Sequence, residues 1–388
     1  MDPTSRSTQT AQEFPESVRE ITDSWKVKRP TYSLSPRLNF CLIALVLILT
    51  LALIFSSVLL ICARDEYFYF GPTSSGSPSQ GDDGNHNNGV ADDEGNYPFA
   101  DGATGNALLP WAEHATPIPA DSIHSSFAAM ADLATGEIIA SRKADEIIYP
   151  ASMTKVMTLI VVVENLPSEA SLRDTITVSN EVFESMRAQG SSGIGMETGE
   201  QLTVEAMLYA LMLRSDGIAA CELARYVAGS EQEFVALMNK KAEMMGLTNT
   251  HFENPTGLYH KDHKTTSREI ASIMAYAMNM NLCRKIMMTQ SYIAPCVGAN
   301  GKTFDYNLYH NLIVTQFEER SEKGLPIHPD SVKVAAGKTG FTDESRFCLV
   351  TYAEAPDGHG YVCVTAKSAS YAECISDYLT IYNSYAKP

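Results

Sequence analysis

The sequence is poor in positive charge. It has 29 lysines and arginines against 46 aspartates and glutamates, which gives a formal net charge of −17. A nucleic-acid partner would need a basic stripe to neutralise its phosphates, so we expect none. Lysine and arginine are absent between Asp65 and Ser141, while residues 81–96 place five acids among glycines and asparagines. We therefore predict an acidic, flexible linker over residues 63–116.

The sequence also lacks paired cysteines at metal-binding spacing. Its eight cysteines include no C-x-x-C pair, which argues against a zinc site built from cysteines. Cys41 and Cys62 lie in an apolar segment, and the others follow no disulfide framework. Cys348 and Cys363 could face each other in a hairpin, but a bond between them is not predicted.

One long segment lacks charge altogether. Residues 40–62 are apolar except for three hydroxyl side chains. As a helix this run would be about 34 Å long, enough for a hydrocarbon core of ~30 Å. We predict a transmembrane signal anchor over 39–62. A cleaved signal peptide is the alternative, but no A-x-A site follows the run.

Charge on either side of this segment predicts its orientation. Residues 26–38 carry lysines and arginines with no acid, whereas Arg64 on the other side is followed by two acids. The positive-inside rule predicts that residues 1–38 form a cytoplasmic tail. The remainder of the chain would then lie on the extracytoplasmic face of the cell membrane, attached through residues 39–62.

From about residue 117 the pattern becomes that of a globular α+β domain, predicted to span 117–388. Strands are expected on both sides of Thr135-Gly136 and over 344–354 and 359–368, and helices over 152–166, 203–215, 230–247, 267–280 and 370–386. Thr203, Ser230 and Ser267 are the expected helix caps. Strands at both ends predict an antiparallel sheet flanked by helices, with a helical subdomain inserted.

Three short motifs carry candidate chemistry. They are Ser152-Met153-Thr154-Lys155, Ser215-Asp216-Gly217 and Lys338-Thr339-Gly340. Residues i and i+3 of a helix share a face, so Lys155 should reach the Ser152 hydroxyl. Lysine can act as a base for serine only when it is neutral, which requires its pKa to fall from ~10.4 toward ~7–8. Burial and a second cation, Lys338, could cause that fall.

Each motif also has a purely structural interpretation. Ser152 could cap its helix, Ser215 could end a helix with Gly217 as its C-cap, and Lys338-Thr339-Gly340 could be a turn before a strand. The S-x-x-K spacing recurs at Ser384, where no other motif accompanies it. The S-x-x-K and K-T-G motifs occur in order, one at a predicted helix start and one leading into a predicted strand, which makes coincidence improbable.

From about Ser126 to its end, the chain resembles the penicillin-binding D-alanyl-D-alanine carboxypeptidases, which share their motif set with class A β-lactamases. The similarity is strongest over residues 135–158, 190–217, 246–271 and 335–354. The resemblance implies removal of the terminal D-alanine from peptidoglycan stem pentapeptides, the wall peptides that are the substrate. It also implies acylation by β-lactam antibiotics such as penicillins.

The resemblance assigns a role to each motif residue. It implies Ser152 as the acylated nucleophile, Lys155 as its base and Ser215 as the proton relay to the departing D-alanine. The substrate-binding set would be Lys338, Thr339, Gly340, Asp216 and Gly217, and the backbone N–H groups of Ser152 and Phe341 would form the oxyanion hole. No metal or organic cofactor is expected, because a serine–lysine pair needs none.

Two positions depart from the family pattern. Gly217 stands where relatives have an asparagine that contacts the motif lysine and the substrate amide. Loss of such a hydrogen bond, worth ~1.5–3 kcal/mol, could slow turnover ten- to a hundredfold. Asp216 or a water molecule could take its place. Arg346 stands where relatives often have glycine.

Three other functions remain open from the sequence. Gly217 is consistent with a membrane-tethered relative that binds wall peptides or β-lactams with little or no turnover. A β-lactamase would need a glutamate in an E-x-x-L-N setting, whereas Glu253 lies in the carboxypeptidase-like "HFENPTGL". A zinc peptidase is suggested only by His260 and His263, which lack an accompanying glutamate at the required spacing.

Overall fold

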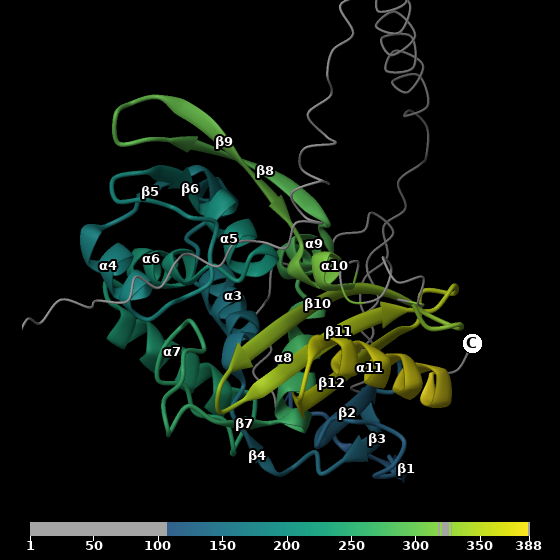
Figure 1. The fold of residues 1–388 in the computed structure, drawn as a ribbon. Helices are drawn as coiled ribbons and strands as arrows, with labels where there is room; N and C mark the ends of the chain where they lie inside the picture. The colour runs from purple at the N-terminus through teal and green to yellow at the C-terminus, as the bar shows by residue number, and fades with distance from the viewer. Residues whose placement is uncertain (1–106, 317–318, 320–325, 327, 387–388) are drawn as a thin grey trace, which may run out of the picture. The chain divides into compact units, whose positions relative to one another are not determined.

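The computed structural model describes residues 107–316, 319, 326 and 328–386 (Figure 1). The predicted cytoplasmic tail, the predicted membrane anchor and most of the predicted linker lie outside these residues. Within the described part, every helix is too short or too polar to cross a bilayer.

A mixed sheet of six strands dominates one side of the described part. Its order is β1-β3-β2-β12-β11-β10, and all neighbours are antiparallel except β1 and β3. The strands are β1 (Trp111–Pro117), β2 (Phe127–Asp132), β3 (Glu137–Arg142), β10 (Lys333–Thr342), β11 (Arg346–Glu354) and β12 (Gly360–Ser368). Early strands therefore lie beside late ones, as predicted (Figure 1).

Helices cover both faces of this sheet, which explains its long apolar strands. Val362 and Val364 of β12 enter the core that includes helix α8 (Ser267–Met278). Tyr361 and Cys363 alternate with them and enter the core beneath α11 (Tyr371–Tyr385). Successive side chains of a strand point to opposite faces, so a strand covered on both faces is apolar throughout.

The inserted part is mainly helical. Its two central helices, α3 (Lys155–Glu164) and α5 (Val204–Leu213), are buried along almost their whole length and are apolar all round. Around them lie α4 (Asn180–Ala188), α6 (Gly217–Ala228), α7 (Glu231–Met244), α9 (Asn281–Met288) and the 3-10 helix η2 (Glu169–Arg173). The short helix α10 (Asn311–Gln316) packs instead against β10 and α11.

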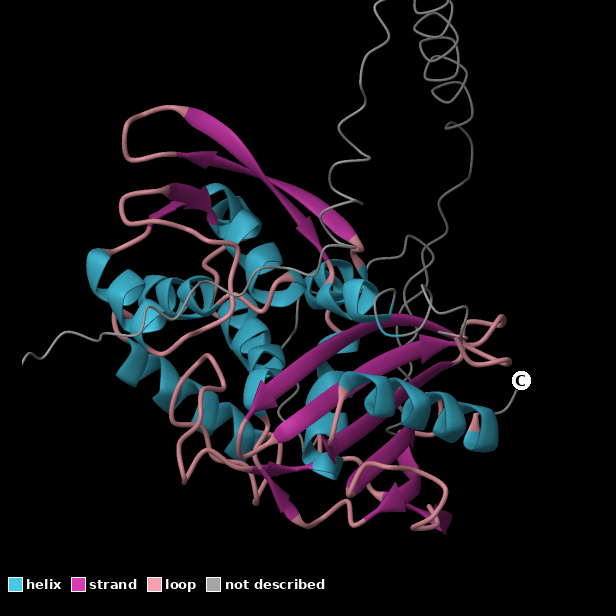
Figure 2. Cartoon of the chain, in the orientation of Figure 1, coloured by secondary structure: helices cyan, strands magenta, loops and turns pink. Residues whose placement is uncertain are grey.

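Two small sheets complete the fold (Figure 2). One pairs β4 (Ile147–Ile148) with β7 (Thr265–Thr266). The other has the order β5-β6-β8-β9 and comprises Thr175–Thr177, Gln201–Thr203, Ser291–Val297 and Thr303–Tyr309. The sequence did not predict these sheets, because their strands are short or largely exposed and show little apolar alternation.

Helix starts test the predicted caps. The side chains of Thr203 and Ser230 accept the backbone N–H three residues on, as predicted. The prediction for Ser267 is wrong: the cap is Thr266, whose hydroxyl accepts the Glu269 N–H at 3.1 Å. Two neighbouring hydroxyl residues compete for this position, and Thr266 has the extended backbone that a cap requires.

Two further predictions need correction. Strand β1 lies within the predicted linker and pairs in parallel with β3, so the folded part begins before residue 117 and its sheet is not wholly antiparallel. Cys363 lies opposite Thr351, not opposite Cys348, so the two thiols do not face each other across the hairpin. All cysteines in the described part are free and buried.

Candidate active site

Ser152 lies in a tight turn at the start of α3. Pro150 precedes a 3-10 turn, η1 (Ala151–Thr154), which continues directly into the helix. Ala151 has a φ of +47°, a strained value for a residue with a Cβ atom. The Ser152 side chain caps neither element, so the interpretation of Ser152 as a simple helix cap is wrong.

Lys155 is the partner of Ser152. Its Nζ lies 3.2 Å from Ser152 Oγ and donates to the carbonyl oxygen of Thr256 at 2.6 Å. Burial lowers the pKa of Lys155 to about 8, against the opposing influence of the nearby Asp216. A substantial fraction of this amine is therefore neutral near physiological pH.

Lys338 forms a second serine–lysine pair. Its Nζ donates to Ser215 Oγ at 2.8 Å and to the carbonyl oxygen of Thr339 at 2.9 Å. Burial, and then the charge of Lys155, lowers the pKa of Lys338 well below its ordinary value. Lys338 lies within strand β10, so the interpretation of this motif as a turn before a strand is wrong.

Two glycines approach the backbone N–H of Ser152 from different segments. A Cβ atom at Gly340, on β10, would lie 3.2 Å from that nitrogen. A Cβ atom at Gly257 would lie 3.0 Å from the same nitrogen and only 1.9 Å from the carbonyl oxygen of Ala151. Any larger residue at Gly257 would displace the turn that carries Ser152, and its φ of +80° independently favours glycine.

Side-chain hydrogen bonds hold the segment that carries Gly257. Asn254 Oδ1 accepts the backbone N–H groups of Thr256 and Gly257, and Asn254 Nδ2 donates to the carbonyl of Leu258. Thr158 of α3 donates to the carbonyl of Pro255 at 2.7 Å. This turn thereby presents the Thr256 carbonyl to Lys155.

Asp216 and Gly217 begin helix α6. The Asp216 carboxylate accepts the N–H groups of Ala219 at 2.9 Å and Ile194 at 2.7 Å, so it caps the helix and holds a neighbouring loop. Burial raises the pKa of this carboxyl group. Gly217 is the first residue of α6, which contradicts its interpretation as a C-cap.

No side chain fits at Gly217 without rearrangement. A Cβ atom there would lie 2.0 Å from Ser191 Oγ and 3.1 Å from Met186 Sδ. The Gly217 N–H donates to the carbonyl of Ser192 at 3.0 Å. The residues of the 191–194 loop therefore fill the space beside Gly217.

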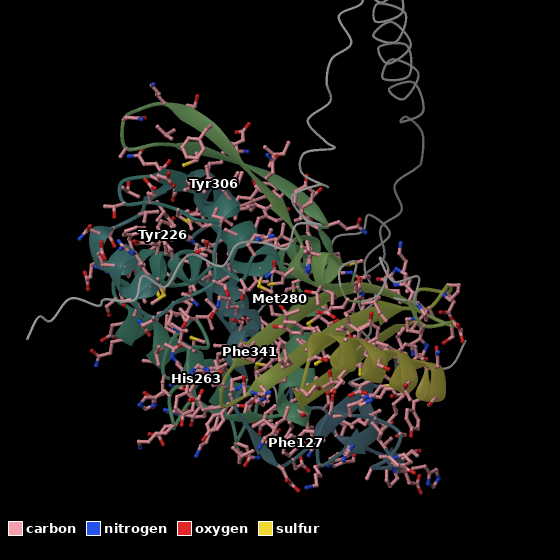
Figure 3. All side chains as sticks on the ribbon, viewed as in Figure 1. Phe127, Tyr226, His263, Met280, Tyr306 and Phe341 are labelled. Carbon is pink, nitrogen blue, oxygen red and sulfur yellow. The ribbon has the colours of Figure 1, made fainter. Side chains whose placement is uncertain are left out.

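The outer end of β10 carries Phe341, which is 44% exposed (Figure 3). Tyr371 of α11 is a neighbour of Thr339 that the sequence did not suggest; burial raises the pKa of its hydroxyl, and the Thr339 side chain opposes that rise. Arg346, at the start of β11, has a φ of +55°. Glycine adopts this conformation readily, which gives a backbone reason why relatives often have glycine at this position.

The two histidines of the zinc-peptidase interpretation, His260 and His263, lie in different environments. His263 is buried, its Nε2 lies 2.8 Å from Thr154 Oγ1, and its Nδ1 accepts the Glu253 N–H at 3.3 Å. Burial lowers the pKa of His263 to about 3, so the ring is neutral. His260 is exposed, and the two do not form a peptidase zinc centre.

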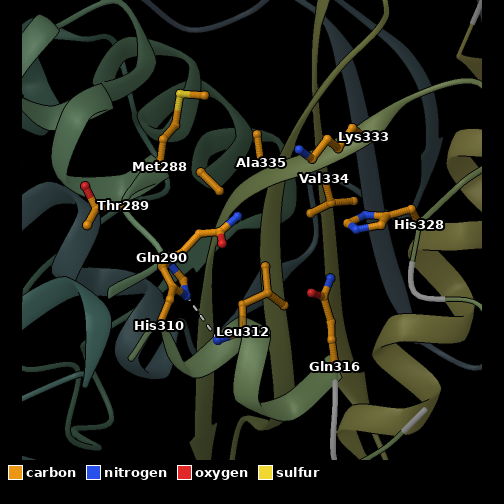
Figure 4. A pocket seen from close by; sticks show the side chains of 11 residues that line it. Met288, Thr289, Gln290, His310, Leu312, Gln316, His328, Lys333, Val334 and Ala335 are labelled. Atoms are coloured by element: carbon orange, nitrogen blue, oxygen red, sulfur yellow. Dashed lines mark hydrogen bonds between the residues drawn. The ribbon is translucent and has the colours of Figure 1, made fainter. Parts of the chain in front are cut away.

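A separate cavity of about 220 Å³ lies beside the N-terminal half of β10, residues 333–336 (Figure 4). Its lining includes Gln290, His310, Gln316 and Lys333. His310 is buried, and burial together with the charge of Lys338 lowers its pKa to about 4. A neutral ring therefore packs near Lys338 and adds no second charge.

These motifs and this fold define a class. The model of the D-alanyl-D-alanine carboxypeptidases, peptidase family S11, matches residues 113–365. The chain belongs to this family, and its α+β transpeptidase-like fold agrees with the predicted class.

Individual relatives are similar at moderate identity. The D-alanyl-D-alanine carboxypeptidase DacF of Bacillus subtilis is 32% identical over 221 residues, covering 57% of this chain and 51% of DacF. The D-alanyl-D-alanine carboxypeptidase of Streptomyces sp. strain K15 is 30% identical over 256 residues, covering 64% of this chain and 82% of that protein. The crystal structure of the Streptomyces K15 DD-transpeptidase matches with a TM-score of 0.59 and 25% identity, covering 68% of this chain and 98% of that one.

The match spans about half the length of DacF. Activity and substrate are therefore inferred from this chain's own residues. Several of these residues were not predicted as functional: Asn254, Thr256, Gly257, Ser191 and Tyr371. The segment "NPTGL" was visible in the sequence, but its roles depend on backbone contacts that have no side-chain signal.

Proposed function

We propose that this protein is a serine D-alanyl-D-alanine carboxypeptidase. It removes the terminal D-alanine from peptidoglycan stem pentapeptides through an acyl-enzyme on Ser152 and is acylated by penicillins at the same residue. The observation that carries the proposal is the contact of 3.2 Å between Lys155 Nζ and Ser152 Oγ, made by a buried amine whose pKa is about 8.

Acylation begins with proton transfer from Ser152 Oγ to neutral Lys155. A neutral amine keeps two N–H groups and one lone pair. Because the Thr256 carbonyl accepts one N–H, the lone pair can face the serine hydroxyl. The serine oxygen then attacks the carbonyl carbon of the penultimate D-alanine, and the backbone N–H groups of Ser152 and Phe341 stabilise the oxyanion.

The second serine–lysine pair acts on the leaving group. When the C–N bond breaks, the proton that Lys155 took from Ser152 passes by way of the Ser215 hydroxyl to the amine of the departing D-alanine, which leaves Lys155 neutral again. The hydrogen bond from Lys338 holds Ser215 in place for this relay. Lys338, Thr339 and Gly340 form the substrate-carboxylate side of the site. Water then hydrolyses the acyl ester and restores Ser152.

A relative that binds wall peptides or β-lactams without efficient turnover is the second candidate. Gly217 favours it, because no amide is available at this position and both Asp216 oxygens accept backbone N–H groups. A β-lactamase has less support. The Glu253 carboxylate lies on an exposed loop, where its partners are His251 and His260 and not Ser152.

We further propose that residues 39–62 anchor the chain in the cell membrane as a single span, with residues 1–38 in the cytoplasm. The catalytic part would lie on the extracytoplasmic face, joined through the acidic linker. Support comes from the uncharged run and from the basic residues that precede it. Protease accessibility in intact spheroplasts tests this topology: the catalytic part should be cleaved and residues 1–38 protected.

Release of D-alanine from an acyl-D-Ala-D-Ala peptide by the full chain in detergent tests the activity. We expect release by the parent, none above background by Ser152→Ala, and parental rates for Ser384→Ala. Ser384 is a matched control because it has the same S-x-x-K spacing, but it is exposed near the end of α11 and its hydroxyl donates to the carbonyl of Thr380. Acylation by penicillin without D-alanine release would favour the binding-only candidate.

A further inference from the structure

We infer that the loop of residues 251–264 contains a binding site for a divalent transition-metal ion such as zinc, formed by Glu253, His260 and Asp262. The candidate ligand atoms of these residues all lie within 4.8 Å of one another. His260 Nδ1 is 3.7 Å from Glu253 Oε2 and 4.0 Å from Asp262 Oδ2. Ligands bound to zinc at ~2.0–2.1 Å in a tetrahedron are about 3.3 Å apart, so small side-chain rotations would complete the site.

A fourth residue orients the glutamate. His251 Nε2 lies 3.1 Å from Glu253 Oε1, the oxygen that does not face His260. Outer residues that hold a ligating carboxylate in this way are typical of metal sites. The loop itself is closed at its base, where His251 and Lys264 exchange backbone hydrogen bonds of 2.8 and 3.0 Å. The ligands therefore stand on a backbone whose ends are fixed.

The ligand chemistry indicates the class of ion. One imidazole nitrogen and two carboxylates suit zinc and similar transition ions better than calcium, which prefers oxygen ligands alone. In the structure, Lys261 Nζ donates to Asp262 Oδ2 at 2.7 Å, and the Asp262 N–H donates to His260 Nδ1 at 3.3 Å. A metal ion would replace both contacts, so Lys261 should compete with it for the carboxylate.

The opposite side of the loop touches the catalytic turn. Glu253 is joined through its N–H to His263, which contacts Thr154 in the nucleophile turn. Three residues on, Thr256 accepts from Lys155. An ion on the outer side would therefore stiffen the segment that positions the base. Only this last consequence rests on the proposed function, since binding itself is independent of Ser152.

Zinc binding to the full chain in detergent tests the inference. After treatment with a chelator, titration calorimetry with zinc sulfate alone should give one ion per chain. Glu253→Gln and Asp262→Asn should weaken binding at least ~10-fold, by analogy with the 10–100-fold cost of losing an outer-shell partner. Lys261→Met should strengthen binding, because the competing ammonium is gone. His114→Ala, which removes an exposed histidine from strand β1, should bind like the parent.

Absence of saturable binding at millimolar zinc would overturn the site, as would unchanged affinity in Glu253→Gln. Circular dichroism of each variant establishes that lost binding does not reflect unfolding. Ser152→Ala should bind zinc with the parental affinity even though it cannot be acylated. Failure of the metal site and failure of the proposed catalysis are thus separate results.

Discussion

Two segments meet at the backbone N–H of Ser152, and they are built differently. On one side is the β10 wall, residues 338–341, which is held by the strand ladder with β11. On the other is the loop wall, residues 254–258, which is held by the side chains of Asn254 and Thr158. Each brings a glycine against the same nitrogen.

This difference predicts how well each wall tolerates a substitution that displaces its backbone. In a ladder, many backbone hydrogen bonds share any displacement, so the β10 wall can adjust as a unit. The loop wall depends on one asparagine, and its glycine is pressed against a backbone carbonyl with far less space. It also supplies the carbonyl that orients Lys155. We therefore expect the loop wall to be the less tolerant of the two.

Among these predictions, loss of the proposed base Lys155 should have the largest effect on acylation. The Lys155 amine contacts the loop wall through the carbonyl of Thr256. Lys155→Met keeps the length and burial of the side chain but cannot accept a proton. General-base catalysis contributes ~10²–10⁴-fold, so the acylation rate should fall by about 10³-fold. Stopped-flow acylation with a chromogenic β-lactam measures it. A loss of less than about tenfold would mean that another group takes the proton.

Alanine at the two glycines compares the walls directly. Gly257→Ala should lower acylation by ~100-fold or more, because its Cβ would lie 1.9 Å from the Ala151 carbonyl oxygen, and a 1 Å misplacement near the chemistry can cost that much. Gly340→Ala, whose nearest contact would be 3.1 Å, should lose only a few-fold. The same acylation assay measures both.

Gly301→Ala is the matched control for backbone strain. Its φ is +77°, close to that of Gly257, yet a Cβ atom there would have no neighbour within 4 Å. It should cost some thermal stability and leave acylation unchanged. If Gly257→Ala behaved like Gly301→Ala, the tight approach to Ser152 would be irrelevant to catalysis.

The pH dependence follows from the lowered pKa of Lys155. The amine is neutral above about pH 8, so acylation should rise through that value and level off at higher pH. Between pH 7 and 9 the expected rise is about tenfold, since the neutral fraction changes from roughly one tenth to nine tenths. A flat profile over this range, at constant ionic strength, would contradict Lys155 as the base.

The position of the missing amide should give the smallest effect. Gly217→Asn alone should reduce D-alanine release a few-fold, because the new Cβ would meet Ser191 Oγ at 2.0 Å. Adding Ser191→Gly removes that obstacle and should restore or exceed the parental rate. A gain from the single variant would show instead that Ser191 moves aside without cost.

Side-chain chemistry identified Lys338, Thr339 and Gly340 of the β10 wall as candidate site residues from the sequence, although no strand was predicted over them. Lys338 and Ser152 belong to short motifs, and the strands that carry the sheet are long apolar runs. The loop wall acts through the backbone atoms of Thr256 and Gly257, which leave no residue-type signature. The predicted Ser267 cap failed for a related reason: two adjacent hydroxyl residues are equivalent in sequence, and only backbone conformation separates them.

At Gly217 the sequence identified an unusual residue but not its structural surroundings. The sequence correctly marked it as unusual, but the space beside it is filled by Ser191, from a loop more than twenty residues earlier. Such a contact depends on how α4 and α6 pack, which local patterns do not encode. The positive φ of Arg346 likewise appears only once the turn before β11 is built.

Mapping the penicillin adduct on the full chain tests the central claim most directly. After brief labelling and proteolysis, mass spectrometry should find the adduct on the peptide that contains Ser152. It should be absent from the peptides that contain Ser215 and Ser384. An adduct on either of those serines, or none on a folded protein, would contradict the convergence of both walls on Ser152.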